Sequence, residues 1–292
     1  MSIKLVCWNI AKRREPWREL VAMDGVDVAV LQEAGRPPPE LVEREWIGPR
    51  KHYDSHVWNS DWFEGRWNRL LDRWPMVVQL SDRVNVEWFN QVSPISRVAQ
   101  DEIAVSGIGH VAAARVIPQQ SEIESFIVVS MYARWIEPHP TTETNWIGYS
   151  DGSAHRIISD LSAFIGNTNP ATHRIIAAGD LNMIFESDPG DPQSLSARER
   201  TVFDRMGALG LELIGPQHPA GRRASPTPHG LEDGTLNVPT FHSTQQAPET
   251  AQSQLDYAFA SRGFHQRVKA RALNSPEECG ASDHCRIVID VG

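Results

Sequence analysis

The sequence predicts an α/β fold with many strands, because β-branched runs and amphipathic helical segments alternate along the whole chain. No linker separates one group of these elements from another, so we expect a single domain over residues 1–292. The composition, with 40% hydrophobic and 22% charged residues, is typical of a globular protein in water.

The predicted strands are short apolar runs bounded by turn-forming or polar residues. In chain order they lie at residues 3–8, 26–31, 126–132, 174–179, 255–260 and 286–291. A further pair is expected within residues 103–116, where the alternation around Gly107 and Gly109 predicts a β-hairpin.

The predicted helices have apolar residues at a spacing of three and four. Trp17, Leu20 and Val21 indicate a short helix after the first strand, and residues 157–165 and 202–209 indicate two more. Residues 215–250 are rich in Pro, Gly, Ser and Thr and are predicted to form a long loop.

Residues 46–90 contain six of the ten tryptophans, namely Trp46, Trp58, Trp62, Trp67, Trp74 and Trp88. The favoured interpretation is that irregular loops and helices pack these large apolar rings onto the core. The alternative is a surface on which bases stack, with Arg66, Arg69 and Arg73 interleaved.

Charge and cysteine content limit the function classes. A formal net charge of −9 argues against a surface that grips long nucleic acid through many phosphate contacts, although it allows a local basic groove or a carboxylate cluster at a cation site. No apolar run approaches the roughly 18 residues that a membrane helix needs, and the N-terminus does not read as a signal peptide. Cys7, Cys279 and Cys285 lack ligand-like spacing, so we expect reduced thiols, no zinc site and a cytoplasmic protein.

Polar residues lie at the ends of five of the predicted strands or in the turns next to them. Each alone has an ordinary explanation, such as a helix cap, a solvated strand end or a surface turn. Together they form one vocabulary of Asn, Glu, Asp and His, and α/β sheets collect their sites where strands end. The residues are Asn9, Glu33, Asp180, Asn182, Asp256, Asp283 and His284.

This set of side chains suits metal-assisted attack of water on a phosphoester. A hard cation such as Mg²⁺ takes carboxylate oxygens, waters and phosphate oxygens. A nearby carboxylate can orient or deprotonate a water, and an imidazolium can stabilise the phosphoryl oxygens. The sequence contains no serine elbow, P-loop or dinucleotide fingerprint that would support a rival chemistry.

Five motifs in the same order resemble those of the endonuclease/exonuclease/phosphatase superfamily, the deoxyribonuclease-I-like and exonuclease-III-like group. They are residues 7–10 (CWNI), 31–33 (LQE), 179–182 (GDLN), 255–259 (LDYAF) and 282–284 (SDH). The resemblance runs from residue 5 to residue 291. It implies a four-layer α/β sandwich in which two mixed β-sheets pack face to face with helices outside.

The resemblance also implies a metal site and a water site. Glu33 is expected to be the principal metal ligand, with Asn9 beside it and Asp283 completing or orienting the shell. Asp180 is expected to position and activate the attacking water, and Asn182 to hold the water or a phosphate oxygen. The implied ion is Mg²⁺, with Mn²⁺ as a substitute.

Four further residues take their expected roles from the resemblance. His284 would contact the scissile phosphate, and Asp256 would hydrogen-bond the imidazole and keep it charged. Tyr132 occupies the place where relatives put a phosphate-contacting Tyr or His, and Thr240, within the segment Pro239-Thr240-Phe241, is expected to line the substrate cleft.

The chain departs from exonuclease-III-like members at two places. Ala11 stands where they often carry an acid, and residues 132–135 read YARW where they tend to have Tyr-x-Pro-Asn. The basic side chains near these places, Lys12, Arg13, Arg14 and Arg134, form either a rim over the phosphate site or a solvated charge cluster. Abasic-site repair is therefore not expected, whereas the hydrolytic residues are all present.

The sequence predicts a Mg²⁺-dependent phosphodiesterase that acts on nucleic acid as an endonuclease or exonuclease. The first alternative is a phosphatase or phosphodiesterase for small molecules on the same scaffold. The second is a catalytically silent binding module, which we consider remote because Glu33, Asp180, Asn182 and His284 are all present. No membrane and no protein partner is expected.

Overall fold

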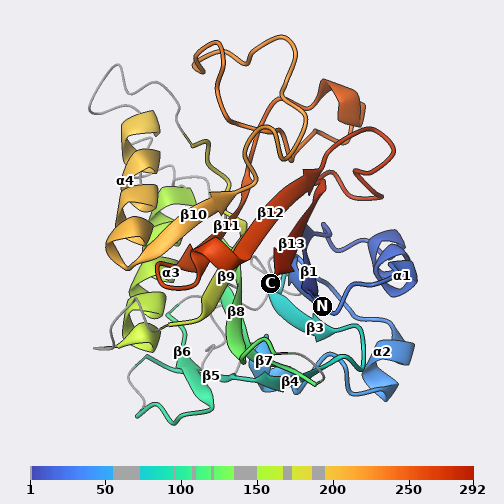
Figure 1. The fold of residues 1–292 in the computed structure, drawn as a ribbon, viewed down its shortest axis with the longest axis vertical. Helices are drawn as coiled ribbons and strands as arrows, with labels where there is room; N and C mark the ends of the chain where they lie inside the picture. Colours follow the sequence, from blue (N-terminus) through green and yellow to red (C-terminus); the bar gives the residue numbers. More distant parts are fainter. Residues whose placement is uncertain are drawn as a thin grey trace, which may run out of the picture.

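Two β-sheets form the centre of the computed structural model, which describes residues 2–54, 73–94, 97–106, 110–119, 122–134, 150–166, 173–185 and 195–292 (Figure 1). The first sheet has five strands, in the order β12 (Val268–Leu273), β13 (Arg286–Val291), β1 (Ile3–Asn9), β2 (Val28–Gln32) and β3 (Met76–Gln79). Of its neighbouring pairs, β1 and β2 are parallel and the others are antiparallel.

The second sheet has six strands in the described residues. Their order is β10 (Leu211–Gly215), β11 (Asp256–Ser261), β9 (Ile175–Asp180), β8 (Phe126–Tyr132), β7 (Val111–Pro118) and β4 (Val84–Trp88). Only β8 and β9 run parallel to each other. Two further short strands, β5 (Asn90–Val92) and β6 (Glu102–Ala104), pair with each other in parallel.

The main core lies between the two sheets. Leu5, Val30 and Ile289 of the first sheet pack with Val128 and Ala178 of the second, all with at most 1% exposure. Because successive residues of a strand point to opposite faces, the other face of each sheet needs a cover of its own.

Helices cover the outer faces. The helix α1 (Glu15–Ala22) buries Trp17 and Leu20 with the outer side of the first sheet, and the short α2 (Pro39–Glu43) adds Leu41. The helices α3 (Ser150–Ile165) and α4 (Leu195–Ala208) cover the second sheet. The described residues also contain three 3₁₀ turns: η1 (Arg50–His52), η7 (Pro248–Thr250) and η8 (His265–Arg267). The four-layer α/β sandwich is therefore confirmed.

The predicted hairpin within residues 103–116 is wrong. The strands on its two sides pair elsewhere, since β6 pairs with β5 whereas β7 lies between β4 and β8. Residues 107–109 themselves lie outside the described residues. Alternation predicts that a segment is a strand, but it does not say which strand becomes its neighbour.

Residues 46–90 are also more regular than predicted, because they contain the strands β3 and β4. Trp46, Trp74 and Trp88 pack against the core clusters, as the favoured interpretation proposes. The other three tryptophans, with Arg66 and Arg69, lie outside the described residues.

The expectation of three reduced cysteines is wrong. Cys279 and Cys285 form a disulfide, with Cα atoms 4.2 Å apart, and only Cys7 is a free, buried thiol. The physical reason is the hairpin connection from β12 to β13, which turns back on itself between these two residues. The disulfide removes the cysteine-based argument for a cytoplasmic location. No helix in the described part of the chain is long and apolar enough to span a bilayer.

The register of the strands brings the polar ends together. Asp180 at the end of β9 lies opposite Tyr132 of β8 on one side and Asp256 of β11 on the other. In the first sheet, Asn9 at the end of β1 lies opposite Gln32 at the end of β2. Because the two sheets pack face to face, both sets reach the same edge of the sandwich.

Candidate active site

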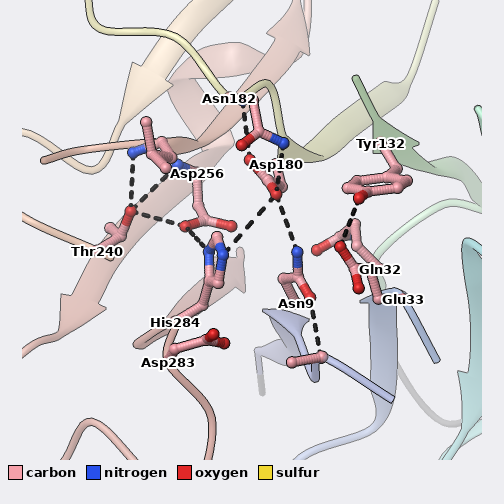
Figure 2. A network of polar contacts seen from close by, with 12 residues as sticks. Asn9, Gln32, Glu33, Tyr132, Asp180, Asn182, Thr240, Asp256, Asp283 and His284 are labelled. Atoms are coloured by element: carbon pink, nitrogen blue, oxygen red, sulfur yellow. Dashed lines mark hydrogen bonds and ion pairs between the residues drawn. The ribbon is translucent and has the colours of Figure 1, made fainter. Parts of the chain in front are cut away.

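Asp180 is the centre of the polar network at this edge (Figure 2). Its Oδ2 atom accepts hydrogen bonds from the side-chain amides of Asn9 (2.9 Å) and Asn182 (3.0 Å). Its Oδ1 atom accepts one from the backbone N–H of Asn182 (2.8 Å), whose φ of 51° turns the chain sharply after β9. Burial raises the pKa of Asp180, whereas the nearby His284 lowers it. The carboxylate is thus rigidly held and suited to accept a proton near neutral pH.

His284 faces Asp180 from the loop before β13. Its Nδ1 atom donates to Oδ2 of Asp256 at 2.8 Å, and its Nε2 atom lies 3.9 Å from Oδ2 of Asp180. Burial alone would lower the pKa of the imidazole, but the two carboxylates overcome this effect and raise it to about 10. The side chain is therefore an imidazolium at neutral pH, oriented by Asp256.

Thr240 fixes Asp256 from behind. Its hydroxyl donates to Asp256 Oδ2 at 2.7 Å and accepts from the backbone N–H groups of Leu255 (3.0 Å) and Asp256 (3.1 Å). Thr240 is fully buried, so it does not lie at the surface of the cleft as its motif suggested. Thr240 therefore holds Asp256 in place, and Asp256 in turn orients the His284 imidazole.

Glu33 occupies the first sheet's side of the site. Its backbone is in the left-handed region, with a φ of 46°, directly after β2. Its Oε1 atom accepts from Arg73 Nη1 at 2.5 Å and from the hydroxyl of Tyr132. Arg73 Nη1 also lies 3.2 Å from the Tyr132 oxygen. Burial, followed by the charge of Glu33, raises the pKa of Tyr132 well above its usual value, so the phenol is neutral.

The loop that carries Asp283 and His284 is tied down at several points. The Ser282 hydroxyl donates to the Asn9 carbonyl at 2.7 Å, and Trp8 Nε1 donates to the His284 carbonyl at 2.7 Å. Arg13 lies 3.7 Å from an Asp283 oxygen and donates to the Ala281 carbonyl at 3.0 Å. The disulfide described above closes the loop on the far side.

These groups open onto a pocket of about 360 Å³. It is lined by Asn9, Ala11, Arg13, Glu33, Arg73, Tyr132, Asp180, Asn182, Phe241, Asp283 and His284. Asp256 and Thr240 stand behind this wall. Lys12 is exposed and does not line the pocket, and Arg134 is buried, with its backbone N–H bonded to Ser153 Oγ at 3.1 Å.

Arg73 lines the pocket, although the sequence analysis did not assign it to this site. Arg73 was a candidate only for base stacking, since nothing local connects it to Glu33 forty positions earlier. Phe241 belongs to the segment expected to line the cleft; it lines the pocket, and its ring lies 5.0 Å from that of His284.

The donor set fits a hard divalent cation. The pocket offers carboxylate and amide oxygens from Glu33, Asp283 and Asn9, and its lining contains no thiol. The Glu33 carboxylate already forms an ion pair with Arg73, which shows that a positive charge is accommodated next to it. Asp180, Asp256 and His284 also place ligand-type atoms within 4.8 Å of one another. That second group is less suited to an ion, because its imidazole is protonated and bonded to Asp256.

Comparison with known proteins identifies the fold through structure alone. No protein-family model matches the chain, and no curated protein sequence matches it. The solved structures that are similar to it over nearly its whole length include the following three. The AP endonuclease LMAP from Leishmania major has a TM-score of 0.59 at 17% identity, covering 99% of this chain and 87% of that one.

The endonuclease domain of TRAS1, a telomere-specific non-LTR retrotransposon, has a TM-score of 0.56 at 15% identity, covering 100% of this chain and 98% of that one. The 3′ phosphatase NExo from Neisseria, bound to a product DNA hairpin, has a TM-score of 0.54 at 16% identity, covering 99% of each chain. The chain has the endonuclease/exonuclease/phosphatase fold. At the edge where this deoxyribonuclease-I-like sandwich gathers its polar strand ends, the chain carries Asn9, Glu33, Asp180 and His284.

Proposed function

We propose that the chain is a Mg²⁺-dependent phosphodiester hydrolase that acts on nucleic acid, with Mn²⁺ as a substitute ion, and that residues 1–292 form one domain. The observation that carries the proposal is the arrangement of Asp180 and His284 across one pocket, with Asp256 behind the imidazole and Glu33 on the opposite wall. The similar structures include endonucleases and a 3′ phosphatase, which supports hydrolysis of phosphoric esters as the reaction class.

Asp180 orients the attacking water and takes its proton. The bonds from Asn9 and Asn182 leave the carboxylate no freedom to rotate, and its raised pKa brings its basicity closer to neutral pH. Asn182 holds the same water or a phosphate oxygen, as its position at the pocket wall allows.

His284 stabilises the charge that develops on the phosphoryl oxygens. Its imidazolium is preorganised by Asp256, so no reorganisation is needed when the charge appears. Tyr132 lines the opposite wall with a neutral hydroxyl, which donates to Glu33 in the structure and would donate to a phosphate oxygen only after leaving Glu33. Arg13 contributes a cation at the rim.

Glu33, Asn9 and Asp283 are the residues that would hold the ion. When bound, the ion supplies Lewis-acid stabilisation of phosphate charge. In the structure, the contacts from Tyr132 and Arg73 orient the Glu33 carboxylate toward the pocket.

A phosphatase or phosphodiesterase for small molecules is the second candidate. The net charge of −9 favours it over a nuclease that follows long nucleic acid. The similar NExo structure is a 3′ phosphatase with a DNA product, so it supports phosphatase chemistry on this fold but not a small substrate. A pocket of about 360 Å³ accommodates a phosphate with part of a nucleotide in either case.

A substrate panel with Mg²⁺, Mn²⁺ or EDTA tests the proposal. It contains single- and double-stranded DNA, RNA, abasic duplex, a chromogenic phosphodiester and several phosphomonoesters. We expect cleavage of oligonucleotides with Mg²⁺ or Mn²⁺ and no cleavage in EDTA. Release of inorganic phosphate without strand cleavage would favour the phosphatase.

The variant Asp180→Asn should lower the metal-dependent rate by about 10²–10⁴-fold, which is the usual contribution of a general base. The matched control is Asp204→Asn, the same change at an exposed position on α4. Full activity of Asp180→Asn, or wild-type activity that persists in excess EDTA, would contradict the mechanism.

A further inference from the structure

A second pocket, of about 440 Å³, lies beside α1 and shares no lining residue with the active-site pocket. It is lined by Arg14, Trp17, Arg18, Arg36, Pro37, Pro38, Pro39 and Glu40, and we call it the arginine–proline pocket. Three guanidinium groups against one carboxylate make it a positively charged place on a chain with a net charge of −9.

The two pockets are immediate neighbours. Arg13 lines the active-site pocket, and the next residue, Arg14, lines the arginine–proline pocket. In the same way, Glu33 lines the active-site pocket and Arg36 lines the arginine–proline pocket. The two backbone segments that supply these residues are joined to each other, since the Lys12 N–H donates to the Glu33 carbonyl at 2.8 Å. Arg36 is three positions after Glu33, so their Cα atoms are at most about 11 Å apart. A nucleic-acid strand in the active site would therefore bring a neighbouring nucleotide to this pocket.

The arginines of the pocket are available for a ligand. Within the described part of the chain, the side chains of Arg14 and Arg36 make no hydrogen bond or ion pair. Arg18 has only Glu15, at 4.0 Å on an exposed surface, which is a weak interaction. All three are exposed, whereas arginines such as Arg198 are held in bidentate ion pairs.

The floor of the pocket is apolar and rigid. Trp17 Nε1 donates to the Ala34 carbonyl at 3.0 Å, which fixes the ring against the loop, and the three consecutive prolines restrict the backbone beside it. Trp17 is only 3% exposed, so the accessible apolar surface is that of the prolines, of which Pro39 is exposed. An apolar surface next to guanidinium groups suits a base or sugar together with a phosphate.

We propose that the arginine–proline pocket binds a nucleotide adjacent to the scissile phosphate, so that the chain acts on oligonucleotides in preference to simple phosphodiesters. This inference rests on the proposed function and names its substrate class.

The test uses the triple variant Arg14→Gln, Arg18→Gln and Arg36→Gln in the full chain. The matched control is the triple variant at Arg115, Arg262 and Arg267, which are also exposed and lose the same charge. Circular dichroism and thermal unfolding establish that both variants fold.

Binding is measured first, by fluorescence anisotropy of a single-stranded DNA 12-mer in EDTA. The pocket variant should bind at least about tenfold more weakly than the control, and its slope of log K against log salt should be less steep by about 2, since each lost phosphate contact removes about 0.7. Equal binding by the two variants would overturn the inference. Stronger competition by an acidic peptide than by unlabelled DNA would also overturn it and assign the pocket to a protein partner.

Hydrolysis is measured next, with the same 12-mer and with a chromogenic phosphodiester. The ratio of kcat/KM on DNA to kcat/KM on the small diester should fall at least about tenfold in the pocket variant and stay constant in the control. A ratio equal to that of the wild type would overturn the inference while the proposed function stands. If the wild type hydrolyses neither substrate but the pocket variant loses DNA binding, the proposed function fails and the binding site remains.

Discussion

Replacing Asp256 with Asn tests whether this carboxylate keeps His284 charged. The change preserves the shape of the side chain and an acceptor for the imidazole N–H, but it removes the negative charge 2.8 Å from Nδ1. Because His284 is only 5% exposed, little solvent replaces the lost charge.

The structure gives the expected magnitude. The two carboxylates raise the pKa of His284 from 6.5 to about 10, which at about 1.4 kcal/mol per unit amounts to several kcal/mol of coupling. An opposite charge in contact typically contributes about 1–3 units, so the pKa should fall by that amount in the variant. Asp180 remains 3.9 Å away and retains part of the effect.

The pKa shift also sets the pH dependence of stability. A pKa raised on folding stabilises the protein fully below pH 6.5, and the stabilisation is lost as the pH rises through about 10. The variant should therefore lose the most unfolding free energy near pH 6, and the difference from wild type should shrink toward pH 10. Urea unfolding at several pH values measures it.

The assay of the pKa itself is an NMR titration of the histidine rings in EDTA, with the His284 resonance identified by its absence in His284→Gln. The alkaline limit of phosphodiesterase activity should move down together with the titration midpoint. Asp290→Asn, the same change on β13, is the control and should move neither. A midpoint in Asp256→Asn equal to that of the wild type would refute the reasoning.

Three other variants probe the residues that support the site. Thr240→Val removes three buried hydrogen bonds and should lower the free energy of unfolding by about 2–3 kcal/mol, with a loss of kcat; urea unfolding at wild-type stability would contradict it. Gly179→Ala should not yield folded protein, because the added Cβ would overlap the backbone carbonyl of Met131, and a wild-type circular dichroism spectrum would show the error. Replacing both Cys279 and Cys285 with Ser should lower the free energy of unfolding by about 2 kcal/mol, which is the chain-entropy value for so short a loop. The same double variant should have a lower kcat. A melting temperature equal to that of the wild type would argue against the disulfide.

The sequence predicted those elements whose signal is local. Residues 126–132 become β8 with the same bounds, and the apolar spacing at residues 157–165 falls within α3. Both segments bury a continuous apolar face, so hydrophobic periodicity alone indicates their structure. Short strands were missed where that signal is weak. β12 reads Val268–Leu273 with two exposed basic residues, and β3 has four residues.

The residues of the pocket were predicted because their identity carries chemistry and because strand ends collect at sheet edges. Asn9, Glu33, Asp180 and His284 all reach one pocket, as their motifs imply. Their catalytic and metal-binding roles remain predictions.

What the sequence alone determined is therefore local: strand and helix segments, and a polar vocabulary suited to phosphoester chemistry. The tertiary structure decided which strands are neighbours, that Arg73 pairs with Glu33, that Cys279 pairs with Cys285, and that Thr240 stands behind Asp256. The physical reason is that these contacts join backbone segments whose approach depends on the packing of the whole sandwich, and no local pattern records that packing.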